Sequence, residues 1–376
     1  MRVALVVPGG VDASGEYRVI PALLALIGRL ARAHDVQVIA LAQEPKPRGW
    51  QLAGATVHNI GVHRTRTRAV RTILALHRAA RFDLLQSIWS GSCGLVAVGA
   101  ARMLRLPSLV HVAGGELVAL REIGYGGMLT WRGRLRERLT LRAASAVSAA
   151  STPVVQAIEA LGVTAQRVPL GVDLNVWLPR EPRRRDPRKT ARLIHVASLN
   201  RVKDQGTLLR AVAELVRAGI DVRMDIVGDD TLAGEVQSMT RELGLSARVD
   251  FRGFLPQRVL RPLVEAADLL VVSSRHETGP LVALEAAAVG VPTVGTAVGH
   301  IAEWAPRAAV AVPVGDHSAL AGAIGGLLAD EQMRLAIAHE ALQRAILEDA
   351  DHTVRCFESI YAMVTQGGSQ RRRHDQ

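Results

Sequence analysis

Aromatic residues are scarce in this chain, at 3% of its 376 residues. Proteins that bind single-stranded nucleic acid stack bases on aromatic side chains, so we expect no nucleic-acid partner. Cysteine is rarer still: only Cys93 and Cys356 occur, too few for a disulfide framework or a cysteine-rich metal site. Long apolar runs are also missing. No uninterrupted stretch reaches about 18 residues, and we therefore expect no membrane-spanning helix.

The amino terminus does not have the pattern of a secretory signal. Met1 leads almost directly into the apolar run Val3–Val7, which reads as a strand, and no charged segment, apolar core and cleavage site follow one another there. We therefore expect a cytoplasmic protein, with peripheral contact to the inner face of the membrane as an open alternative.

Acidic residues are fewer than lysine and arginine together, which gives a formal net charge of +11 and a sequence pI near 10.8. Such an excess suggests an acidic lipid surface, a nucleic acid or an anionic substrate as partner. In the segment 131–139, arginines alternate with Trp131 and leucines, a pattern that predicts an amphipathic helix resting on anionic headgroups. The arginines at 183–185 and 371–373 read instead as disordered, solvated charge.

Apolar runs alternate with helical patterns along the whole chain, which predicts an α/β protein of two doubly wound domains with parallel sheets. Strands are expected at 3–7, 36–41, 84–87, 108–112 and 146–149 in the first half, and at 193–197, 222–228, 249–251 and 268–272 in the second. We place the domains at 1–175 and 190–350, with a proline- and arginine-rich linker at 179–189 and a disordered basic tail at 367–376. Ligands of such domains bind outside the carboxyl ends of the strands.

The most informative segment sets two carboxylates seven residues apart. A buried strand ends near Val272, Glu277 follows in a loop, and a helix beginning near Pro280 carries Glu285 about two turns further on. Gly290 is expected to end this helix. The first-turn N–H groups near Gly279, Leu281 and Val282, together with the helix dipole, favour a phosphate.

This segment resembles the E-x7-E motif of the family 4 retaining glycosyltransferases, also called glycosyl transferases group 1, which have the GT-B fold. The resemblance implies two Rossmann-like domains facing across a cleft, with Glu277 reaching hydroxyls of the donor sugar and Glu285 holding the ribose. Further matches cover most of the chain: 168–173 resembles the family's I-P-N-G-V-D hinge, 226–229 its L-I-G-D strand end, and 315–320 its G-D-x-x-x-L element. In this last element, Asp316 and Leu320 read as a helix start and its core anchor. The helical pattern at about 353–366 resembles the helix that crosses back to the first domain.

A second motif implies a site for the donor pyrophosphate. Residues 197–204 resemble the family segment G-R-L-x-x-x-K-G, with Lys203 at the lysine. Ser198 stands where the arginine is expected, and Arg201 is our candidate to replace its charge. Cations are required because the departing diphosphate gains negative charge. No Asp-x-Asp pattern stands in a plausible loop, so neither a metal site nor a cofactor is expected.

Glycines follow the first strand at Gly9 and Gly10, and Gly15 belongs to the same loop, which resembles the family's glycine-rich loop near donor phosphate or acceptor. The pattern is not a complete G-x-G-x-x-G, which speaks against a dehydrogenase. His111 falls inside a strand and is expected to be packed rather than catalytic. Glu116 is expected either to bind a sugar or acceptor hydroxyl or to sit at a helix start, and the role of His300 is left open.

These observations predict a metal-independent, retaining transfer of a sugar from a nucleotide diphosphate sugar to an acceptor hydroxyl. Glu277, Lys203 and Arg201 are the expected catalytic residues; the expected binding residues are Glu285, Gly9, Gly10, Gly15, Ser198, Gly279, Leu281, Val282 and Glu116. The donor base and sugar stay open, as do the oligomeric state and the acceptor, which is a lipid, a polysaccharide or a small metabolite. Two alternatives are a GT-B sugar-nucleotide epimerase and a non-catalytic binder of anionic surfaces or nucleic acid.

Overall fold

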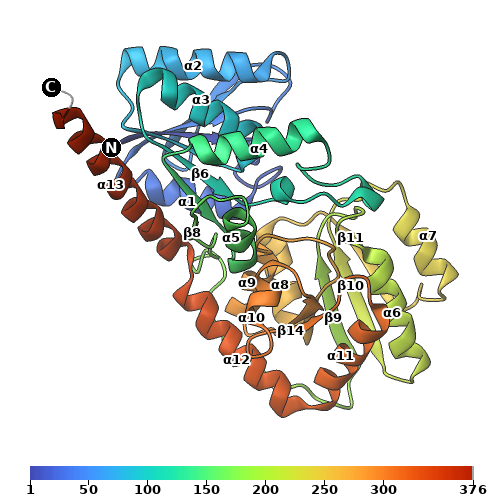
Figure 1. Cartoon of the computed structure of the whole chain (residues 1–376). Helices are drawn as coiled ribbons and strands as arrows, with labels where there is room; N and C mark the ends of the chain where they lie inside the picture. Colours follow the sequence, from blue (N-terminus) through green and yellow to red (C-terminus); the bar gives the residue numbers. More distant parts are fainter. Residues whose placement is uncertain (375–376) are drawn as a thin grey trace. The chain divides into compact units, whose positions relative to one another are not determined.

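The computed structural model describes residues 1–374, and they divide into two compact units. Unit 1 comprises Met1–Gly171 and the chain from Ala350 onward, while unit 2 comprises Val172–Asp349. The expected linker at 179–189 lies inside unit 2. Each unit is an α/β structure with one sheet, as the alternating pattern predicts (Figure 1).

Unit 1 has an eight-stranded sheet in the order β3-β4-β2-β1-β5-β6-β7-β8. Its strands are β1 (Arg2–Val7), β2 (Asp35–Ala40), β3 (Arg48–Leu52), β4 (Ala55–Asn59), β5 (Leu84–Ile88), β6 (Ser108–Val112), β7 (Ala146–Ala149) and β8 (Gln166–Arg167). Its α-helices are α1 (Pro21–Leu30), α2 (Thr65–Ala79), α3 (Leu95–Leu104), α4 (Trp131–Ala143), α5 (Thr152–Glu159) and α13 (Ala350–His374). Short helical turns are η1 (Ser90–Gly94), η2 (Gly115–Leu117) and η3 (Arg121–Ile123).

One edge of this sheet differs from the expected all-parallel arrangement, because β3 pairs antiparallel with β4. Ala53 and Gly54 connect the two strands with φ angles of 49° and 84°. Two successive left-handed residues form the tight turn that matches the twist of a hairpin. Neither strand was predicted, because neither is a continuous apolar run.

Unit 2 has a six-stranded sheet in the order β11-β10-β9-β12-β13-β14, and its strand pairs are parallel. Its strands are β9 (Ala191–Val196), β10 (Val222–Val227), β11 (Val249–Gly253), β12 (Leu269–Val272), β13 (Thr293–Thr296) and β14 (Val310–Val312). Its helices are α6 (Gln205–Arg217), α7 (Glu235–Glu242), α8 (Gln257–Ala266), α9 (Leu281–Ala288), α10 (Gly299–Trp304), α11 (His317–Ala329) and α12 (Glu331–Leu347).

In both sheets, the direction in which successive strands are added reverses at the centre of the sheet. In unit 2 the chain runs outward from β9 to β10 and β11, and then restarts at β12 and runs the other way. Unit 1 repeats this pattern, with β2 on one side of β1 and β5 on the other. Loops diverge at such a point, and the carboxyl ends of the two central strands are therefore the default place for a ligand.

Helix α13 completes the core of unit 1 although it comes last in the sequence. It lies beside α1, as Figure 1 shows, and Arg29 on α1 forms an ion pair of 2.8 Å with Asp351. Its apolar face buries Phe357 and Tyr361, which join the cluster formed by β1, β2 and β5. The backbone of 367–374, expected to be a disordered tail, continues this helix, and residues 375 and 376 lie outside the described residues.

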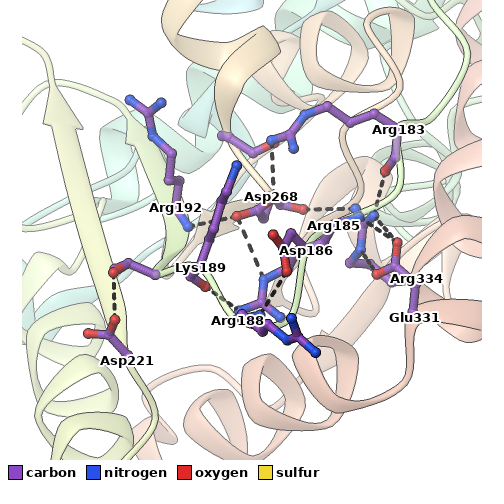
Figure 2. Close-up of polar contacts among 12 residues, drawn as sticks. Arg183, Arg185, Asp186, Arg188, Lys189, Arg192, Asp221, Asp268, Glu331 and Arg334 are labelled. Atoms are coloured by element: carbon purple, nitrogen blue, oxygen red, sulfur yellow. Dashed lines mark hydrogen bonds and ion pairs between the residues drawn. The ribbon is translucent and has the colours of Figure 1, made fainter.

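The arginine-rich linker is not the solvated, disordered segment that the sequence analysis predicted. The Arg183 guanidinium donates to the carboxylate of the buried Asp268 at 3.0 Å, and Arg185 Nε lies 3.9 Å from the same group (Figure 2). Arg334, which is also buried, donates to the carbonyl of Arg183 at 2.6 Å and to Glu331 at 2.8 Å. These contacts hold the linker against the start of β12 and the start of α12.

Candidate active site

The site begins with two loops of unit 2 that leave the central strands β9 and β12. Ser273 Oγ donates to the carbonyl of Lys203 at 2.8 Å, and the backbone N–H of Arg275 donates to the carbonyl of Val202 at 2.7 Å. These bonds join the loop that contains Lys203 to the loop that contains Glu277. Because both loops follow strands at the centre of the sheet, they lie where a ligand is expected.

Lys203 and Glu277 meet directly. The lysine Nζ lies 2.5 Å from Glu277 Oε1, and the side chains are 25% and 14% exposed. Ser274 Oγ donates to the same carboxylate oxygen at 2.7 Å. The pair joins residues 74 positions apart in the sequence and brings the two motifs side by side. The arrangement offers a cation for a phosphate and an oriented carboxylate for a hydroxyl.

Glu285 lies on α9, which begins at Leu281 directly after Pro280, as predicted. Its side chain is 5% exposed and accepts a hydrogen bond of 3.0 Å from Gln257 Nε2. Burial raises the pKa of this carboxyl to about 7 because water no longer stabilises the charge, and the bond from Gln257 opposes the shift. A carboxyl with this pKa changes its charge near neutral pH.

The start of α9 is shaped by a close neighbour. A side chain at Gly279 would come within 2.6 Å of Nε2 of His300, which is fully buried and lies against Trp304 at a ring distance of 5.6 Å. His300 therefore determines which residue fits at position 279. Leu281 and Val282 are half-buried in the first turn of the helix, whose amides lack acceptors within the helix itself.

Arg201 does not join Lys203 and Glu277. Its guanidinium pairs with Glu235 at 3.2 Å, and both side chains are more than half exposed. The expectation that Arg201 replaces the missing arginine at Ser198 is therefore not met by this arrangement. The carbonyl of Ser198 instead accepts a bond of 3.2 Å from Gln205 Nε2.

The remaining predicted site residues belong to unit 1. Gly9 and Gly10 follow β1, and Gly10 has a φ of 77°, which favours glycine. Gly15 is also left-handed, with a φ of 66°. Glu116 is buried, and its two carboxylate oxygens accept backbone N–H groups of Ser90 at 2.9 Å and Gly114 at 2.7 Å. Glu116 therefore holds two loops together, and it lies in the first turn of η2, in agreement with the helix-start alternative of the prediction.

Two further predictions about individual side chains are confirmed. His111 is fully buried in β6 and its ring packs edge-on against Phe357. Its Nδ1 forms a hydrogen bond of 3.0 Å with Ser148 Oγ. Burial lowers its pKa to about 3, so it is a packed, neutral imidazole. Asp316 caps α11 by accepting from the N–H of Ala319 at 2.9 Å, and Leu320 is fully buried.

No role was predicted for Ser274 or Gln257, although Ser274 contacts Glu277 and Gln257 contacts Glu285. Ser274 lies three residues before Glu277 in the same loop and was a visible candidate. Gln257 lies 28 positions before Glu285, and no spacing rule points to it. Over residues 1–374, no cluster of three or more metal-ligating side chains is found, and no helix has both the length and the apolar character needed to cross a bilayer.

Two family models match the chain, one in each unit. Residues 19–171 match a glycosyl transferase 4-like domain, and residues 180–344 match glycosyl transferases group 1. A D-inositol 3-phosphate glycosyltransferase from Thermomonospora curvata is 31% identical over 252 residues, which is 60% of this chain and 58% of the relative. An N-acetyl-alpha-D-glucosaminyl L-malate synthase from Bacillus anthracis is 30% identical over 173 residues, 45% of this chain and 44% of the relative. The chain thus spans about half the length of the curated relatives that it matches.

Solved structures support the same assignment at the level of the fold. Sucrose-phosphate synthase from Thermosynechococcus elongatus has a TM-score of 0.81 at 18% identity, over 98% of this chain and 100% of that chain. Anabaena HepE in complex with UDP-glucose has a TM-score of 0.74 at 19% identity, over 96% of this chain and 100% of that chain. The epimerase and the non-catalytic binder are not favoured by these matches. Together, the two family models and the relatives place the chain in the glycosyl transferases group 1 family, and the solved structures show that it has the GT-B fold.

Proposed function

We propose that this protein transfers a sugar from a nucleoside diphosphate sugar to an acceptor hydroxyl, without a metal ion and with retention at the anomeric carbon. The observation that carries the proposal is the contact between Lys203 and Glu277, two side chains from neighbouring central loops. Lys203 would bind a diphosphate, and Glu277 would bind a sugar hydroxyl. The names of related structures add support, since HepE is described in complex with UDP and with UDP-glucose.

Each charged group has a distinct proposed role. Lys203 stabilises the charge that grows on the departing diphosphate, and Glu277 orients the sugar and stabilises positive charge at its anomeric carbon. Glu285 accepts hydrogen bonds from the ribose. The bond from the anomeric carbon to the phosphate oxygen breaks, the acceptor oxygen bonds to the same face, and the acceptor proton passes to the departing diphosphate. This course needs no protein nucleophile.

Unit 1 supports a proposal about the acceptor. A cavity of about 970 Å³ lies at the carboxyl ends of β1, β2 and β5, lined by arginines of α2 and by Trp89. Trp89 has a φ of 75°, a strained conformation for a bulky residue, and such strain concentrates at functional sites. Within the described chain, no carboxylate pairs with the lining arginines, which are Arg64, Arg66, Arg68 and Arg71.

Unneutralised arginines around a cavity favour an acceptor that carries a phosphate or another anionic group. Several relatives are named for D-inositol 3-phosphate, which has this chemistry. We propose a phosphorylated acceptor for this chain. The wild type should glycosylate D-inositol 3-phosphate, or another phosphorylated polyol, in preference to the unphosphorylated compound. Arg68→Gln with Arg71→Gln should raise KM for that acceptor about tenfold and leave donor binding unchanged. Equal use of both compounds would refute this part alone.

The donor proposal is tested by thermal stabilisation with a panel of UDP-, GDP- and ADP-sugars, because a selective ligand raises the apparent stability by mass action. One nucleotide class should stabilise the wild type, and Glu285→Ala should abolish the shift. Product analysis by NMR should show the donor's anomeric configuration, and activity should survive chelation of divalent cations. An inverted product or complete loss of activity with a chelator would contradict the corresponding part of the proposal.

A further inference from the structure

Helix α4 presents an unusual exposed face. Trp131, Leu135 and Leu139 stand at successive i, i+4 positions and are 63%, 48% and 59% exposed. Side chains at this spacing share one side of a helix. The opposite side, with Gly133, Glu137, Thr140 and Leu141, is buried in unit 1. The exposed stripe is thus a surface feature of a helix whose opposite side is packed in unit 1.

Arginines flank the stripe on both sides. Arg132, Arg134, Arg138 and Arg142 are all exposed, and in the described part of the chain none forms an ion pair with a carboxylate. Arg132 lies over the Trp131 ring at 5.4 Å, while Arg134 and Arg142 donate to backbone carbonyls of Met128 and Leu161. The only acid of the helix, Glu137, is fully buried against Arg136 and Ser90. The face therefore carries four uncompensated positive charges.

The neighbouring surface continues this pattern. A second cavity, of about 530 Å³, contains Arg132 together with Arg66 and Leu95, which is 39% exposed. Cations and exposed apolar side chains thus extend from α4 towards the start of α3. The whole surface lies within unit 1.

We infer that the exposed face of α4 is a docking surface for an anionic lipid bilayer. Tryptophan and leucine enter the boundary between headgroups and acyl chains, while arginines on both sides meet the lipid phosphates and the aliphatic parts of their side chains stay at the boundary. This combination of apolar centre and cationic rim is complementary to an anionic membrane surface.

Other occupants fit less well. A second copy of the chain, packed through the same face, would bring the arginine rims of the two copies against each other. A nucleic acid would satisfy the arginines but leave both leucines in water, and a single tryptophan gives little stacking. A bilayer uses the apolar and the charged side chains at once.

The test is co-sedimentation of the protein with phosphatidylcholine vesicles, with or without about a third of phosphatidylglycerol. We expect pelleting with the anionic vesicles only, weakened by salt because screening reduces the attraction. Leu135→Ser with Leu139→Ser should weaken binding at least tenfold, and so should Arg134→Gln with Arg138→Gln. Trp131→Phe should remove the blue shift of tryptophan emission that anionic vesicles produce.

Matched controls on unit 2 distinguish lipid binding by this face from non-specific effects of net charge and of exposed apolar side chains. Arg210→Gln with Arg217→Gln removes the same charge from exposed positions of α6, and Met333→Ser with Leu347→Ser removes exposed apolar groups from α12. Both controls should bind vesicles as the wild type does. Equal losses in controls and α4 variants would overturn the inference, as would pelleting with neutral vesicles. A self-association lost in the α4 variants, without lipid binding, would assign the face to a second copy instead.

Discussion

At the scale of single residues, the ion pair of Lys203 and Glu277 distinguishes two cations of the same loop. Lys203 contacts the carboxylate of the site, whereas Arg201 lies at the surface with Glu235. We expect Lys203→Ala to lower kcat about 100-fold, since a fixed cation no longer stabilises the leaving diphosphate. Arg201→Ala should change kcat less than twofold. Steady-state kinetics with the matching donor checks both, and a comparable loss in Arg201→Ala would restore that arginine to the catalytic set.

Glu285 gives the site a dependence on pH. Its pKa of about 7 in the folded state lies above its usual range, so between about pH 4.5 and 7 the folded protein binds a proton that the unfolded chain has released. Stability should therefore fall as the pH rises through this window, and the unfavourable burial of the charge is complete above it. Glu285→Gln should remove this slope and be the more stable protein at pH 8. Urea unfolding at pH 5 and at pH 8 measures the difference.

The same ionisation should affect donor binding in the opposite direction. The ribose hydroxyls need an ionised carboxylate as acceptor, so the Kd of a nucleotide sugar should rise by up to tenfold from pH 8 to pH 6. Glu285→Gln should bind weakly at both values. Calorimetric titration with an intact nucleotide sugar, whose phosphates do not titrate in this range, provides the measurement; a flat wild-type profile would show that Glu285 does not hold the ribose.

At the scale of elements, the linker cluster around Asp268 connects segments far apart in the sequence. We expect Asp268→Asn to destabilise unit 2 by about 2 kcal/mol, because the guanidinium of Arg183 and the nearby Arg185 lose a buried negative partner. Arg184→Gln, at an exposed position of the same segment, should have no measurable effect. Denaturant unfolding compares the two variants, and equal stabilities would show that the cluster seen in Figure 2 contributes little.

The linker cluster also shows what local sequence patterns do not predict. Continuous apolar runs predicted β6 and β7 to the residue, and Pro280 marked the start of α9. The hairpin β3–β4 escaped because its strands mix Trp50 and Leu52 with polar residues. Arg183 and Arg185 looked solvated because the carboxylate near both guanidinium groups, that of Asp268, lies more than 80 positions away in the sequence. Local pattern determines elements, but the partner of a charge depends on the tertiary fold.

The same distinction between local pattern and tertiary contact applies to the candidate site. Family motifs pointed to Glu277, Lys203 and Glu285 because each motif is a short run that leaves a strand or starts a helix. They did not reveal that Arg201 has a partner of its own, Glu235, since that contact joins the loop after β9 to α7. The lesson concerns cations in particular: an arginine near a motif supplies charge to the site only if no carboxylate lies closer.

At the scale of the whole molecule, the chain returns to unit 1 after completing unit 2, and α13 is required for the first core. Phe357 is fully buried, with its ring 5.3 Å from that of His111 on β6. Tyr361 donates to Gln86 on β5, and Thr353 accepts from the N–H of Gly171 at 2.8 Å. The stability of the sheet of unit 1 thus depends on residues of α13, which follow unit 2 in the sequence.

We therefore expect Phe357→Ala to destabilise unit 1 selectively, by about 3–5 kcal/mol, through lost burial and the cavity left beside His111. Met363→Ala, on the same helix but 50% exposed, is the matched control and should be nearly neutral. Hydrogen exchange followed by mass spectrometry resolves the units: protection should fall in β1, β5 and β6 and persist in β9, β10 and β12. An equal loss in both sheets would mean that the two units unfold as one cooperative body, and no loss in β1 would mean that the amino-terminal core is stable without the ring of Phe357.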